Sequence, residues 1–155
     1  MVAGSIGAED FGRLFLRYKD KFIAIACSFT RDRVAAEDIV TESFTAFWTS
    51  REHIELKSSP EAYILRTVRN RSLNYMRDKA VRMRAEGTLR NEAADSIEME
   101  AEVLAEENTD ILFGTELASI FRDFMAKMPE LTRNIFMDSR FEGLTYNEIA
   151  AKYDV

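Results

Sequence analysis

The sequence has few of the residues that carry covalent or metal chemistry. Its 155 residues include one cysteine, Cys27, and one histidine, His53. A single cysteine excludes an intramolecular disulfide and favours the reducing cytoplasm as the compartment. One cysteine and one histidine also supply no zinc ligand set and no nucleophile and base pair that can be placed. The sequence therefore predicts a cytoplasmic protein that is not an enzyme and has no cofactor or metal site.

Residues that interrupt helices and strands are also scarce, and so are long apolar runs. The chain has two prolines and six glycines, and no stretch alternates apolar and polar residues long enough to indicate a sheet. Its longest apolar run is far shorter than the ~20 residues of a membrane span. We expect an all-α fold without membrane insertion. Helical spacing of apolar residues places the helices at residues 9–30, 33–50, 60–84, 112–128, 129–141 and 146–153.

Charge is unevenly distributed along the chain. The net charge of −6 argues against a nucleic-acid partner, but residues 1–84 hold 15 basic and 11 acidic side chains, whereas residues 85–155 hold 6 and 16. Residues 66–84 contain seven bases and one acid, and residues 85–110 contain nine acids and one base. We expect 85–110 to be an acidic linker, weakly helical at most, between two groups of three helices.

The expected helix at 60–84 has two unlike faces. Its apolar face carries Ile64, Val68, Ser72, Tyr75 and Met76, and its opposite face carries Arg66, Asn70, Arg77 and Arg84. A solvated basic face explains this pattern, and so does contact with phosphates and stacked bases. Two alternatives also stay open for the linker, which either folds back over the basic helix or is a solvated tether.

Four segments carry a recognisable pattern in a fixed order. They are residues 36–44 (AEDIVTESF, followed by Phe47 and Trp48), 60–77 (PEAYILRTVRNRSLNYMR), 128–136 (MPELTRNIF) and 142–150 (EGLTYNEIA). Together they resemble the sigma factors of bacterial RNA polymerase, within the small extracytoplasmic-function (ECF) group of the sigma-70 superfamily. The resemblance implies a transcription initiation factor that binds core RNA polymerase and directs promoter recognition and melting of the minus-ten element.

The resemblance also implies roles for particular residues. Helix 33–50 would bind a coiled coil of the largest polymerase subunit through Asp38, Thr41, Glu42 and Thr45. The loop 51–59 and the helix after it would contact promoter DNA and hold a flipped base, through Lys57, Ser58, Ser59, Tyr63, Arg66, Arg69, Asn70 and Arg77. Members of this group are often held inactive by an anti-sigma factor, which the resemblance admits as a further partner.

The same resemblance divides the chain into two small domains. Residues 1–84 correspond to sigma region 2, 85–110 to the linker, and 111–155 to a region 4 helix-turn-helix truncated before its recognition helix. We expect such a chain not to read a minus-thirty-five element. Two other functions stay open: a DNA-binding transcription regulator that acts without polymerase, and a helical protein-interaction module with no nucleic-acid role.

Overall fold

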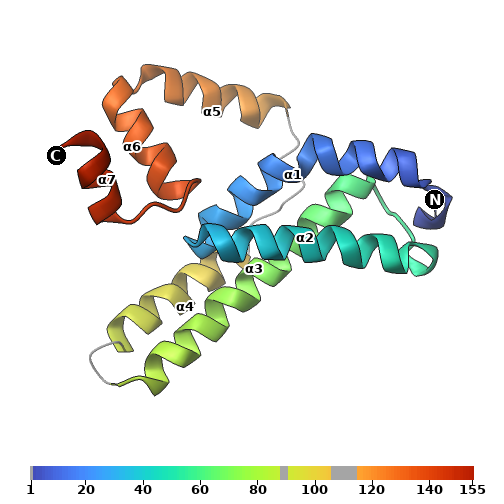
Figure 1. Ribbon diagram of the computed structural model, residues 1–155, viewed down its shortest axis with the longest axis horizontal. Coiled ribbons are helices and arrows are strands. Elements are labelled where there is room, and N and C mark those ends of the chain that lie inside the picture. The colour runs from blue at the N-terminus through green and yellow to red at the C-terminus, as the bar shows by residue number, and fades with distance from the viewer. Residues whose placement is uncertain (1, 88–90, 106–114) are drawn as a thin grey trace.

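The all-α prediction is confirmed. The computed structural model describes residues 2–87, 91–105 and 115–155, and within them it contains seven α-helices and no strand (Figure 1). The helices are α1 (Ala8–Thr30), α2 (Arg33–Ser50), α3 (Pro60–Ala85), α4 (Asn91–Ala105), α5 (Thr115–Lys127), α6 (Glu130–Arg140) and α7 (Tyr146–Tyr153), with short 3-10 turns at Ala3–Ser5 and Arg51–His53. No helix in the described ranges is long and apolar enough to cross a membrane.

Local capping signals fix where several helices begin. The Asp32 carboxylate accepts a hydrogen bond from the Ala35 amide (3.1 Å) at the start of α2. Ser59 accepts one from the Ala62 amide (3.3 Å) at the start of α3, with Pro60 in its first turn. A reciprocal capping box between Thr145 and Glu148 begins α7. Each cap satisfies backbone amides that have no partner inside the helix.

Helices α1, α2 and α3 enclose the main core. Its largest fully buried side chains are Phe22, Phe44, Phe47, Ile64 and Leu65. Aromatic rings connect α1 to α2, as in the edge-to-face contact of Phe15 and Phe44 at 5.1 Å between ring centroids. Cys27 is fully buried in the same core, and burial raises the pKa of its thiol. This packing fixes α2 and α3 relative to each other, so the side chains on their outer faces have defined positions.

The expectation that residues 85–110 are weakly helical at most is wrong for Asn91–Ala105, which form α4. This helix runs back along the carboxyl-terminal half of α3 (Figure 1). Ala94 and Ala101 are fully buried, and Ile97 and Ala105 are partly buried. Spacings of three or four residues place these side chains on one helix face despite the surrounding acids. Residues 88–90 and 106–110 of the expected linker lie outside the described residues.

Helices α5 to α7 form a smaller group beside the three-helix bundle (Figure 1). Asp138 on α6 accepts hydrogen bonds from Lys152 (2.8 Å) and from the Tyr153 hydroxyl, which ties α6 to α7. The turn between these helices needs Gly143, because its φ is +71° and a Cβ there would lie 2.8 Å from the Cys27 sulfur. Beside it, Glu142 pairs with Arg33 at 2.9 Å, so this turn rests on the corner between α1 and α2.

Candidate nucleic-acid and polymerase interface

The four residues predicted to contact a protein partner lie together on the outer face of α2. Asp38, Thr41, Glu42 and Thr45 are all exposed, while Ile39, Val40 and Phe44 on the opposite face are buried. The Thr45 hydroxyl donates to the Thr41 carbonyl (2.8 Å), as threonines inside helices commonly do. Glu42 pairs with Arg71 of α3 at 3.1 Å. The face is therefore acidic and polar, and Glu42 already has a cationic partner within the chain.

The basic side chains of α3 do not all lie on one surface. Asn70 and Arg77 are exposed and Arg66 is half-buried, and the three share one face of the helix. Arg69 lies on the neighbouring face, where its guanidinium donates to the backbone carbonyl of Ala105 on α4. The Arg69 Nε is buried without a hydrogen-bond partner in the structure. We call Arg66, Asn70 and Arg77 the basic stripe, and Arg69 is not part of it.

A small cleft opens at the amino-terminal end of the basic stripe. It has a volume of about 180 Å³. The Tyr63 ring forms one wall and packs against Phe47, with 5.8 Å between ring centroids. All four predicted residues of the loop and helix start therefore meet in one hollow, together with the first residue of the basic stripe. The lining consists of Glu55, Leu56, Lys57, Ser58, Ser59, Tyr63 and Arg66.

Comparison with protein families agrees with this arrangement. Residues 14–82 match the family model of sigma-70 region 2. We refer to residues 14–82, which are similar to sigma-70 region 2, as the region 2 domain. The match supports membership of the sigma-70 superfamily and indicates a sigma-factor role in transcription initiation, which implies binding to RNA polymerase. No curated protein and no solved structure matches the chain.

The region 2 domain begins inside α1, includes α2 and ends near the end of α3. It therefore contains both the acidic face of α2 and the basic stripe with its cleft. An intramolecular hydrogen bond holds α2 and α3 together, because the Tyr75 hydroxyl donates to the Asp32 carboxylate at 2.9 Å. The bonds from the Ala35 amide and from Tyr75 hold the pKa of Asp32 below its usual value.

The sequence reasoning missed the second apolar face of α3. Leu73 and Met76 are buried against α4, and Ala80 is buried on the same side of the helix. Their spacing of three and four residues was a usable signal, because it marks a second apolar face, which α4 and Phe29 of α1 cover. The matching signal on α4 is the series Ala94, Ile97, Ala101 and Ala105. The series was overlooked because the segment around it is rich in acidic residues.

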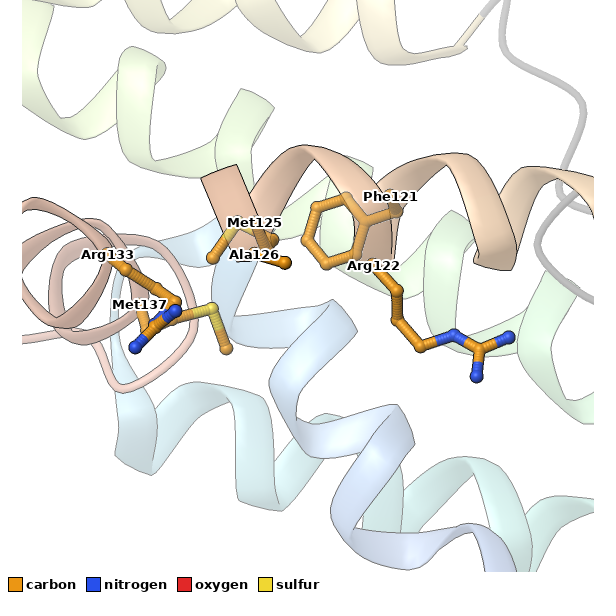
Figure 2. Close-up of a pocket in the computed structure, with 6 residues that line it drawn as sticks. All are labelled: Phe121, Arg122, Met125, Ala126, Arg133 and Met137. Carbon is orange, nitrogen blue, oxygen red and sulfur yellow. The ribbon is translucent and has the colours of Figure 1, made fainter. Parts of the chain in front are cut away.

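An apolar hollow lies outside the region 2 domain, between α5 and α6. It has a volume of about 390 Å³ and is lined by Phe121, Arg122, Met125, Ala126, Arg133 and Met137 (Figure 2). Figure 2 shows the Arg122 side chain extending away from the other five. Ile120 and Phe124 nearby are each 59% exposed. In the described ranges, no group of histidine, cysteine and carboxylate side chains could hold a metal ion.

Proposed function

We propose that this protein is a transcription initiation factor of the ECF group. In this function it binds core RNA polymerase through α2 and holds the melted minus-ten element of promoter DNA with the basic stripe and its cleft. The observation that carries the proposal is that the cleft and the stripe are continuous. Tyr63 and Arg66 line the cleft, and Arg66 is also the first cation of the stripe.

This continuity suits one extruded base followed by its backbone. A cleft of about 180 Å³ is smaller than the ~300 Å³ or more of typical sites for drug-sized ligands, so it suits a group of single-base size. Flipping a base costs a few kcal/mol, and stacking on an aromatic ring returns about 1–3 kcal/mol. Tyr63 supplies the ring, while Ser58 and Ser59 supply hydroxyls for hydrogen bonds to a base edge. Arg77 then lies further along the path of the strand, where it can bind phosphate.

The α2 face supports the polymerase half of the proposal. Asp38 and Thr41 face solvent, and Glu42 can exchange Arg71 for a cation of a partner, because exposed ion pairs contribute only about 0–1 kcal/mol. Carboxylates one helical turn apart present paired acceptors to arginine or lysine. A basic helical surface, such as a polymerase coiled coil, is the partner that this chemistry fits.

The remaining helices extend the proposal. We infer that α5, α6 and α7 are the beginning of a region 4 domain, because α6 and α7 are joined by a short turn and α7 begins with a capping box. An anti-sigma factor remains a proposed partner of the same protein.

The polymerase contact can be tested by charge reversal. Asp38→Arg should lower the affinity of the full chain for purified bacterial core RNA polymerase by roughly tenfold or more, because like charges would face each other. Asp20→Arg on α1 is the matched control, since Asp20 is also exposed and the charge change is the same. Fluorescence anisotropy of labelled protein measures both. Equal affinities for the two variants contradict the α2 assignment.

The DNA contact is tested in the assembled complex of the protein with core polymerase. Tyr63→Leu keeps an apolar side chain against Phe47 but removes the ring, and should weaken binding of single-stranded oligonucleotides by roughly fivefold or more. Tyr63→Phe keeps the ring and should bind within about twofold of the unchanged protein. If Tyr63→Leu binds as well as Tyr63→Phe, the cleft does not stack a base.

A further inference from the structure

Two arginines of α3 donate hydrogen bonds to α4. The Arg84 guanidinium donates to the carboxylates of Asp95, in the second turn of α4, and of Glu98, at its middle. At the carboxyl-terminal end of α4, the Ala105 carbonyl accepts from Arg69. The contact between the two helices therefore begins and ends with an arginine of α3. Helical spacing places Arg84 on the same face of α3 as the basic stripe, and its side chain reaches the carboxylates of α4.

Between these arginines the contact is apolar, and the side chains that α4 contributes to it are mainly alanines. Leu73 and Met76 meet Ala101, and Phe29, Ile97 and Ala105 are partly buried around them. The ion pairs themselves are partly open to water, since the side chains of Arg84, Asp95 and Glu98 are 34%, 69% and 46% exposed. Ion pairs at that exposure are weak and are screened by salt. A competing anion can therefore replace the carboxylates.

Phosphate is the anion that fits this position best. A guanidinium binds phosphate oxygens with the same fork of donors that it offers to a carboxylate. Arg84 lies seven residues, or about two helical turns, beyond Arg77 of the basic stripe. A nucleic-acid strand that follows the stripe toward the carboxyl-terminal end of α3 would therefore reach Arg84 next.

We propose that α4 is an internal competitor of nucleic acid on α3. Asp95 and Glu98 occupy the position that a phosphate would take at Arg84. The strand therefore binds first at the cleft and the basic stripe, and it reaches Arg84 only when the α4 carboxylates move away from that side chain. The inference rests on the proposed function, since it requires that α3 bind nucleic acid. Its consequence is low affinity of the free protein for arbitrary nucleic acid.

The test compares two pairs of substitutions that change the charge of α4 equally. The first pair is Asp95→Asn with Glu98→Gln, which releases Arg84. The control pair is Glu92→Gln with Glu102→Gln, two exposed residues of α4 for which the described part of the chain shows no ion pair. The full chain is titrated with fluorescein-labelled oligo(dT) at several salt concentrations, and circular dichroism confirms equal helix content.

The releasing pair should bind oligo(dT) roughly three to ten times more tightly than the control pair at low salt. Its affinity should also fall more steeply with salt, by about 0.7 in the logarithmic slope for one added phosphate contact. Adding Arg84→Gln to the releasing pair should remove the gain. Equal affinities for the two pairs, or a gain that persists without Arg84, would overturn the proposal.

A second measurement needs no variant of α4. Hydrogen exchange of the unchanged protein should become faster in α4 when oligo(dT) binds, and unchanged or slower exchange there contradicts displacement. Failure of the proposed function has a different signature, because Arg66→Ala with Arg77→Ala would then leave oligo(dT) affinity unchanged. If that double variant weakens binding while the two α4 pairs bind equally, only the competitor role is overturned.

Discussion

The two apolar faces of α3 differ in what covers them. The face toward α1 and α2 is part of a core of large side chains, including Phe22, Phe44 and Leu65, all of them fully buried or nearly so. The face toward α4 buries Leu73 and Met76 against alanine, and half-exposed ion pairs flank it. The side chains buried in the first case are larger, so the α1–α3 bundle should resist salt while the contact with α4 should weaken in salt.

The largest effect is expected from a cavity in the main core. Phe44→Ala should lower the free energy of unfolding of the bundle by about 3–5 kcal/mol, because it removes a buried ring that contacts α1. Urea denaturation followed by circular dichroism measures the loss. Phe124→Ala is the control, since Phe124 is 59% exposed and its truncation should change little. Similar losses for both variants would contradict the assignment of Phe44 to the main core.

A smaller effect is expected at the contact with α4. Leu73→Ala should cost about 2 kcal/mol, and its loss should be confined to α4, whose amides should exchange faster while those of α1 and α2 stay protected. Leu16→Ala on α1 serves as the control, because Leu16 is 75% exposed. Uniform loss of protection across all four helices would show that α4 is as integral to the bundle as α2.

The Asp32 cap should contribute about 1 kcal/mol to the bundle. Asp32→Ala removes the acceptor of the Ala35 amide and of Tyr75, whereas Asp32→Asn keeps an acceptor oxygen and should lose less. Because the pKa of Asp32 is lowered in the folded state, its charged form stabilises the fold fully above the unfolded pKa of about 3.9. That contribution is lost as pH falls through the folded pKa. The difference in stability between the unchanged protein and Asp32→Asn should therefore shrink in strong acid, whereas the difference between the two variants should not depend on this group's titration. A constant difference between the unchanged protein and Asp32→Asn at every pH contradicts the contribution of the Asp32 charge.

The smallest effect is that of salt on α4. Raising NaCl from about 0.05 M to about 0.5 M should speed hydrogen exchange in α4 by an amount equivalent to less than about 1 kcal/mol, since it screens the pairs of Arg84 with Asp95 and Glu98. Exchange in the buried parts of α1 and α2 should hardly change. If salt leaves α4 unaffected, its apolar contact alone holds it on α3.

Sequence reasoning succeeded where the signal is local. The apolar spacing of the expected helices depends on neighbours within one or two helical turns, and the predicted helices match α1, α2 and α3 within a residue at each end. Five of the seven residues that line the cleft, Lys57, Ser58, Ser59, Tyr63 and Arg66, were named in advance through the family resemblance. The α4 helix was missed because its apolar face consists mainly of alanines among carboxylates.

The sequence by itself determined that the chain is helical, where most helices begin, and that one helix carries a concentrated positive charge. Only the tertiary structure decided which of those cations α4 engages. Arg69 and Arg84 donate hydrogen bonds to α4, whereas Arg66 lines the cleft and the Arg77 side chain is exposed. The physical reason is that helical periodicity places Arg69 on another face but Arg84 on the same face as the basic stripe, so periodicity alone does not say which cation is covered. Which face is covered depends on the packing of a segment distant in sequence, here α4, whose small side chains allow it to lie close against α3.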